Sequence, residues 1–209
     1  MSDEDLRQLE RDGAHSDEDQ ARLLAARVRA GTLDPGRLEL AALFGIEAAA
    51  QAVEALGLPP GEGDLRDRVI AAALRTRDPK ETLVRVTLAV GKHMMAWSKA
   101  QSYIRRVHRQ EMKAAAAAMV IAHEWLRSPT SAAAEAAISS SAAVSELAPF
   151  FDPARVAGQI IASTAPTGGR ESASRVAVVA LAPLNWGDPG PIAAVVREEM
   201  GPWLLSEPG

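Results

Sequence analysis

The chain has 209 residues, a formal net charge of −4 and no cysteine. Alanine supplies 42 residues, whereas aromatic residues make up only 4%. Because alanine is the best helix former and a poor strand former, this composition argues against an all-β fold. The absence of cysteine excludes disulfides, cysteine-ligated metal sites and thiol catalysis.

Capping signals mark helix starts along the chain. Ser16 and Asp19 have the spacing of a capping box with Asp in place of Glu. Asp followed by Pro recurs at 34–35, 78–79 and 152–153, where Asp is an N-cap and Pro occupies the first helical position. Gly31 lies where a left-handed helix end is expected. The predicted helices cover residues 3–12, 17–30, 35–44, 46–56, 64–76, 79–98, 106–127, 131–144, 153–164, 170–182 and 191–201.

These elements predict an all-α protein, either an irregular multi-helix bundle or a short helical-repeat-like array of about ten helices. The Gly- and Pro-rich segment 57–63 is the clearest linker. It divides an N-terminal helical module, residues 1–57, from a main bundle, residues 64–209, and we expect the two to pack as one globular unit. Residues 175–181 are β-branched enough for a strand, but no second convincing strand exists to pair with them, so a helix is favoured.

After Pro79, the region up to residue 127 contains no further proline, and Gly91 is its only glycine. It forms either one long helix or two helices joined by a corner near 98–103, where polar residues interrupt the apolar pattern. Compact packing of a chain of this size favours the corner.

Charge is segregated along the chain. Residues 1–20 carry eight acidic and two basic side chains, a net of −6, while residues 80–113 carry eight basic and two acidic ones, a net of +6. One interpretation is that the acidic head, residues 1–20, folds onto the basic segment, residues 80–113, or simply keeps the protein soluble. The other is that the basic segment faces an acidic protein or nucleic acid. Nucleic acid is the less favoured partner, because only Trp97 and Tyr103 are interleaved with the basic residues.

The amino terminus is acidic and lacks the basic-then-apolar order of a signal peptide. The longest near-apolar runs, such as residues 114–122, are far shorter than the ~20 residues that span a bilayer. We therefore expect a cytoplasmic protein with no membrane partner.

No pattern in the chain points to catalysis or to a bound cofactor. His93, His108 and His123 are spaced by fifteen residues, which is ~22 Å along one helix. His93 and His123 approach one another only if the chain doubles back near residue 100. Glu124 either points outward while Trp125 points inward, which is favoured, or is buried against a basic partner such as Lys92 or Arg105. We expect no catalytic residue, no metal and no cofactor.

The stretches 84–97 and 112–129 resemble the all-helical immunity protein families of bacterial polymorphic-toxin systems. The shared pattern is an alanine-rich helix that ends near an aromatic residue, a short corner, and a second helix ending in His123-Glu124-Trp125-Leu126. An alanine-rich tail of further helices follows from Ser131. The resemblance implies a protein that binds a toxin and performs no chemistry on it, so it carries over no active-site residue.

We therefore predict a non-catalytic protein-binding protein, an immunity or adaptor component of a bacterial toxin or defence system. Tyr and Arg are the residue types enriched at binding hot spots. The predicted protein-binding residues are Lys99, Tyr103, Arg105, Arg106 and Arg109. The alternative is a structural or scaffold subunit of a larger assembly, which would dock through a late apolar segment: residues 176–184, Trp186 and residues 203–205. The sequence leaves the oligomeric state open.

Overall fold

The computed structural model of the chain describes residues 16–59, 61–147 and 177–206, together with Glu4 and Gln8. Regular structure in these ranges is helical, with no strand among them, so the predicted all-α class is confirmed. The helical elements are α2 (Asp17–Arg29), α3 (Pro35–Leu43), α4 (Glu47–Ala55), α5 (Leu65–Leu74), α6 (Pro79–Ala100), α7 (Ser102–Val107), α8 (Arg109–Arg127), α9 (Ser131–Leu147), η1 (Ala182–Asn185) and α12 (Gly190–Leu204). Apart from Glu4 and Gln8, the predicted helix 3–12 lies outside the described residues, as do the predicted helix 153–164 and residues 170–176 of the predicted helix 170–182.

The predicted caps form where the sequence signals lie. The Ser16 hydroxyl accepts the backbone N–H of Asp19 at 3.1 Å. The Asp34 carboxylate accepts the N–H groups of Gly36 and Arg37, and Pro35 takes the first position of α3. The pair at 152–153 lies outside the described residues. Each cap satisfies N–H groups that the first helical turn leaves without a partner.

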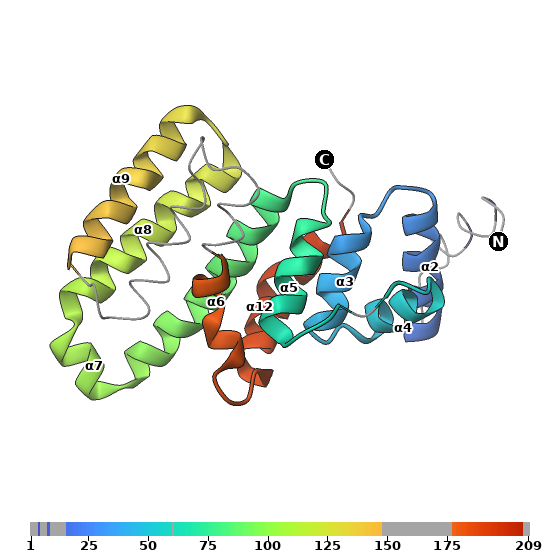
Figure 1. Cartoon of the computed structure of the whole chain (residues 1–209), viewed down its shortest axis with the longest axis horizontal. Helices are drawn as coiled ribbons and strands as arrows, with labels where there is room; N and C mark the ends of the chain where they lie inside the picture. The colour runs from blue at the N-terminus through green and yellow to red at the C-terminus, as the bar shows by residue number, and fades with distance from the viewer. Residues whose placement is uncertain (1–3, 5–7, 9–15, 60, 148–176, 207–209) are drawn as a thin grey trace.

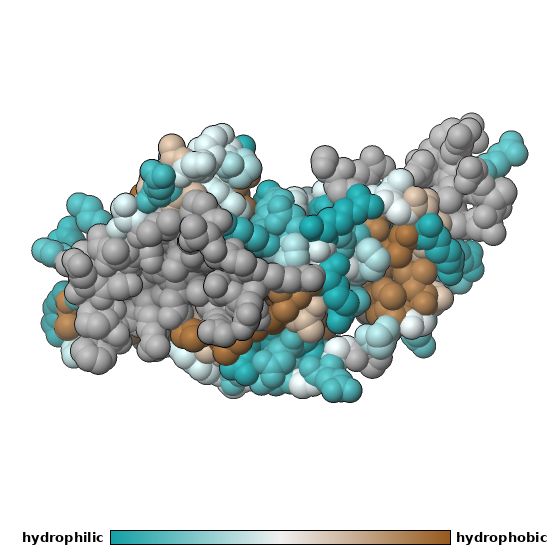
Figure 2. Space-filling model, turned by 45° about the horizontal axis from the view of Figure 1, so that its top comes forward, coloured by the Kyte–Doolittle hydropathy of each residue, from teal (hydrophilic) through white to brown (hydrophobic). Residues whose placement is uncertain are grey.

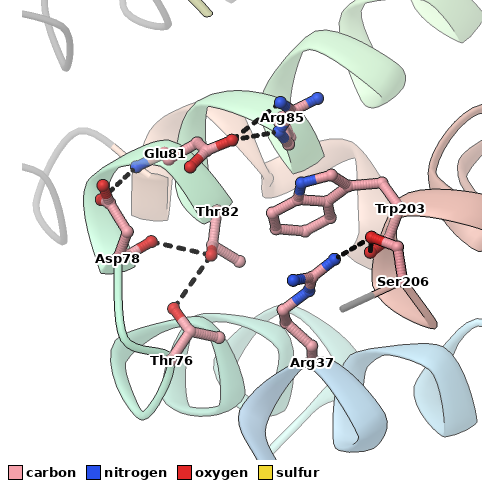
Figure 3. Close-up of polar contacts among 8 residues, drawn as sticks. All are labelled: Arg37, Thr76, Asp78, Glu81, Thr82, Arg85, Trp203 and Ser206. Carbon is pink, nitrogen blue, oxygen red and sulfur yellow. Dashed lines mark hydrogen bonds and ion pairs between the residues drawn. The ribbon is translucent and has the colours of Figure 1, made fainter. Parts of the chain in front are cut away.

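The start of α6 is tied to the end of α5 by a short chain of hydroxyl contacts (Figure 3). Asp78 caps α6 by accepting the N–H of Glu81, and the Thr82 hydroxyl donates to the backbone carbonyl of Asp78. The hydroxyls of Thr76 and Thr82 lie 2.9 Å apart and both side chains are buried. The turn between the two helices is therefore fixed by local polar contacts.

Two clusters of buried side chains form the interior. The first joins α2, α3, α4, α5, α6 and α12 with residues 177–184, and the second joins α6, α8 and α9. Figure 1 shows the resulting arrangement, with α2, α3 and α4 at one end, α6 and α12 in the middle, and α7, α8 and α9 at the other end. Buried residues such as Leu40 and Val69 lie in one cluster although the predicted linker separates them. The division at 57–64 stays a prediction.

Small residues line the contacts between neighbouring helices. Ala115, Ala118 and Ala122 on α8 are fully buried in the same cluster as Ala134 and Ala137 on α9. At the α3–α5 contact, a Cβ added to Gly36 would lie 2.6 Å from the carbonyl oxygen of Ala72. Only glycine fits there without moving one helix.

The C-terminal helix docks on the first cluster through a tryptophan between two arginines (Figure 3). The Arg37 guanidinium lies 4.0 Å and the Arg85 guanidinium 4.7 Å from the centroid of the Trp203 ring. Arg37 also donates to the Ser206 hydroxyl at 2.9 Å, and Arg27 donates to the Leu205 carbonyl at 2.9 Å. Burial lowers the pKa of Arg37, opposed chiefly by the nearby Asp34 carboxylate.

The corner predicted near 98–103 is present and contains one more element than expected. α6 runs to Ala100, Gln101 adopts an extended backbone, and the six-residue α7 follows before α8 begins at Arg109. Residues 177–180 are helical and lead into η1, which supports the helix prediction for the described part of 175–181. α9 continues to Leu147, three residues beyond its predicted end.

Candidate interaction surface

The end of α6, all of α7 and the start of α8 form one exposed corner, residues 97–109, which we call the basic corner. Figure 1 shows it at the opposite end of the molecule from α2. α7 makes few contacts with the interior. None of its residues is fully buried, and its partly buried Ile104 packs on the second cluster. The corner is therefore held mainly by the two long helices that it connects.

Three large apolar side chains of the basic corner face solvent. The exposed fraction is 49% for Trp97, 65% for Tyr103 and 49% for Val107. The helical spacing of the buried residues explains Trp97, because Met94, Met95 and Ser98 occupy the buried face of α6 at this point. The same spacing in the sequence places Trp97 on the outer face, and our predicted site omitted it.

Four cations accompany these apolar groups, and the corner has no acidic residue. Lys99, Arg105, Arg106 and Arg109 are all exposed, and none of their side chains has an ion-pair or hydrogen-bond partner in the part of the chain that the structure describes. Several cations elsewhere are engaged, for example by the ion pairs Arg22–Glu18, Arg85–Glu81 and Lys92–Glu199. The five predicted residues thus lie together on the exposed corner formed by α6, α7 and α8, but nothing in the structure tests their role.

The described acids of the amino-terminal segment do not reach the basic corner. Glu18 and Asp19 contact Arg22 on their own helix, at 2.5 and 3.8 Å. α2 packs on α4 at the far end of the molecule (Figure 1). Within the described residues, the positive charge of the corner is therefore not neutralised by the acidic head.

The histidines do not assemble a metal site in the described ranges, where no group of three His, Asp or Glu side chains is placed to hold an ion. His15 lies outside the described residues.

His123 lines a small depression of about 60 Å³ together with Arg85, Lys92 and Glu199. Loss of water contact lowers the pKa of the His123 ring, and the positive charge of Arg127 lowers it further. Partial burial likewise lowers the pKa of His93.

Glu124 points outward and Trp125 inward, which was the favoured interpretation. Glu124 is exposed and Trp125 is 8% exposed, with the Lys80 ammonium 5.2 Å from the centroid of the indole ring. Lys92 pairs with Glu199 on α12 instead of Glu124. No buried acid is therefore available at this position for proton transfer.

The late apolar segment is divided between the interior and the surface. Leu181, Leu184 and Leu204 are buried in the first cluster. Val178, Val179 and Trp186 are exposed, Trp186 by 54%. The part of this segment that remains open to a second chain is thus smaller than the sequence predicted.

No helix in the described part of the chain combines the length and the apolar character that crossing a bilayer requires. Comparison of the chain with known protein families, with curated proteins and with solved structures gives no match.

Proposed function

We propose that the protein acts by binding an acidic surface of another protein through the basic corner, as a non-catalytic immunity or adaptor component of a bacterial toxin or defence system. The observation that carries this proposal is the combination of three exposed large apolar side chains with four unpaired cations on residues 97–109. The resemblance of residues 84–97 and 112–129 to immunity protein families supports the choice of partner class.

The physical basis is that of a binding hot spot. Trp, Tyr and Arg carry most of the binding energy in typical interfaces. Burying Trp97 and Tyr103 under a partner removes apolar surface from water, and Val107 extends that surface. Because the cations have no partner within the described chain, pairing with carboxylates would not first require breaking an internal ion pair.

A protein partner is favoured over an extended polyanion. The whole chain has a net charge of −4, so a long polyanion that extends beyond the corner is repelled by the rest of the chain. An interface limited to the corner brings only its four positive charges into contact. Binding to a toxin at this face would act by steric occlusion, with the charges setting partner choice.

The test is affinity capture from the native host, followed by calorimetry with the captured protein, using single charge-reversal variants. Arg106→Glu on the corner is compared with Arg29→Glu, because both residues are exposed and lack a partner in the described chain. We expect Arg106→Glu and Tyr103→Ala each to weaken binding about tenfold or more, and Arg29→Glu to leave it unchanged.

Equal recovery of the partner with Arg106→Glu and Arg29→Glu would remove the corner from consideration. Capture that disappears after nuclease treatment, or binding to vesicles of anionic lipid that Arg106→Glu abolishes, would overturn the choice of a protein partner.

A second candidate function is that of a scaffold subunit, favoured by the exposed side chains of Val178, Val179 and Trp186. This function predicts self-association or a stable complex through residues 178–186. Light scattering of the purified chain distinguishes the two candidates, because a monomer whose state is unchanged by Trp186→Ser contradicts self-assembly through this segment.

A further inference from the structure

A groove at the end of the molecule opposite the basic corner is large enough to hold a small molecule. It lies between α3, α4 and the beginning of α5, with Gly57, Leu58, Pro59 and Gly61 along one side, and its volume is about 500 Å³. Figure 2 shows hydrophobic side chains reaching the surface at this α2–α4 end, between hydrophilic ones. A volume of this size lies within the range of typical ligand pockets, about 300–1,000 Å³.

The lining is apolar along the helices. Leu43 from α3, Val53 from α4 and Leu58 from the following segment contribute partly buried side chains. Glu39 also lines the groove, but its carboxylate is paired with Arg75. The body of a bound molecule would therefore meet mainly hydrocarbon.

Two opposite charges that have no partner in the described chain also line the groove. Glu54 lies in the last turn of α4, and Arg68 lies four residues into α5. Neither takes part in an ion pair, and the Arg68 Nε is buried without a hydrogen-bond partner. Both charges therefore remain available to a ligand in the groove.

The helix ends reinforce this separation of charge. The carboxyl end of α4 carries partial negative charge and favours a cation, whereas the amino end of α5 carries partial positive charge and favours an anion. Gly61 lies over the stem of Arg68, and a Cβ added to it would be 3.3 Å from the Arg68 Cγ. The connecting segment thus packs on the stem of Arg68 and limits where its guanidinium lies.

We propose that this groove binds a small zwitterion with an apolar body, such as a short apolar peptide, with its ammonium group on Glu54 and its carboxylate on Arg68. This site is independent of the basic corner and of the function proposed for it. The apolar lining selects the body of the ligand, and the two unpaired charges select its termini.

The probe is the dipeptide leucyl-leucine, together with its N-acetyl and C-terminal amide derivatives, each of which lacks one terminal charge. Binding is measured by calorimetry and by chemical-shift changes on the full chain. We expect leucyl-leucine to bind saturably and each derivative to bind about tenfold more weakly, because one charged hydrogen bond is lost.

Variants then assign each charge. Arg68→Met should weaken leucyl-leucine about tenfold and abolish the preference for the free carboxylate, while the preference for the free ammonium remains. Glu54→Gln should do the reverse. Ala50→Leu adds bulk at a partly buried lining position and should block binding without altering the charges. Arg29→Met is the matched control on another surface and should leave binding unchanged.

The proposal is overturned if leucyl-leucine shows no saturable binding, if its two blocked derivatives bind as well as the free dipeptide, or if Arg68→Met and Arg29→Met have equal effects. Far-ultraviolet circular dichroism of each variant shows that it is folded, and chemical-shift changes confined to α3, α4 and α5 place the bound dipeptide in this groove.

Discussion

Replacement of Trp203 by alanine is the sharpest test of how the C-terminal helix is held. The indole ring lies between the guanidinium groups of Arg37 and Arg85 (Figure 3). Its removal deprives both arginines of their stacking partner, and Arg37 is only 6% exposed. The Nε of Arg37 already lacks a hydrogen-bond partner in the described structure, so after loss of the ring the buried charge keeps only the Ser206 hydroxyl and the nearby Asp34 carboxylate.

The magnitude follows from burial and from the two ring contacts. Replacement of a buried tryptophan by alanine costs about 3–5 kcal/mol. Each guanidinium contact accounts for about 0.5–1 kcal/mol of this loss at a partly exposed site. Because Trp203 retains some exposure, we expect a decrease of about 3 kcal/mol in the free energy of unfolding. That is a large part of the total stability of an ordinary domain, about 5–15 kcal/mol.

The assay is urea unfolding followed by far-ultraviolet circular dichroism, which does not depend on the tryptophan that is removed. Trp186→Ala is the matched control, because Trp186 is 54% exposed and should change stability by less than about 0.5 kcal/mol. Trp203→Phe, which keeps an aromatic face for both arginines, should fall between the two. Equal stability of the Trp203→Ala and Trp186→Ala variants would refute the account of the docking.

Three further predictions concern packing, capping and pH. Gly36→Ala should destabilise the chain by about 1–3 kcal/mol in the same unfolding assay, because its Cβ would meet the carbonyl of Ala72 at 2.6 Å. Asp34→Ala should cost about 2 kcal/mol or more, because this buried carboxylate accepts the N–H of Arg77 at 2.7 Å besides capping α3; a loss below that of Ser16→Ala would contradict this. The folded state lowers the pKa of His123 below its ordinary value of about 6.5. As the pH falls through this value, the unfolded chain therefore binds more protons than the folded chain, and the free energy of unfolding decreases from its value at higher pH. His123→Gln should reduce this decrease in the urea midpoint, and an unchanged pH profile would exclude His123 as a contributor.

The helix starts were predictable because their causes are local. An Asp-Pro pair specifies both the cap and the first helical residue, and α3 and α6 begin at the positions that such pairs predict. Gly31 has a φ of 74°, as expected for a glycine that ends a helix. Signals contained within four residues of chain are read correctly from the sequence because no distant contact competes with them.

Contacts between distant residues were not predictable in the same way. Lys92 and Glu199 pair across 107 positions, and Arg27 reaches the Leu205 carbonyl across 178. In the sequence Trp203 was part of an apolar segment free to dock on another chain, whereas the folded chain uses it against its own arginines. Nothing in the local pattern distinguishes these outcomes. The groove between Glu54 and Arg68 was missed for the same reason, since it exists only after α3, α4 and α5 pack.

The basic corner differs from the rest of the described chain in that its binding candidates contribute little to the fold. Its four cations are exposed and have no partner there, so reversal of one of them should change stability by less than about 0.5 kcal/mol. Arg37 and Arg85, in contrast, support Trp203, and their substitution would alter folding and binding together. Loss of partner binding by an Arg106→Glu variant of unchanged stability is therefore attributable to the surface itself. If Arg106→Glu instead lowered the free energy of unfolding by well over about 0.5 kcal/mol, the corner would be part of the packed structure, and the loss of binding could not be assigned to the surface alone.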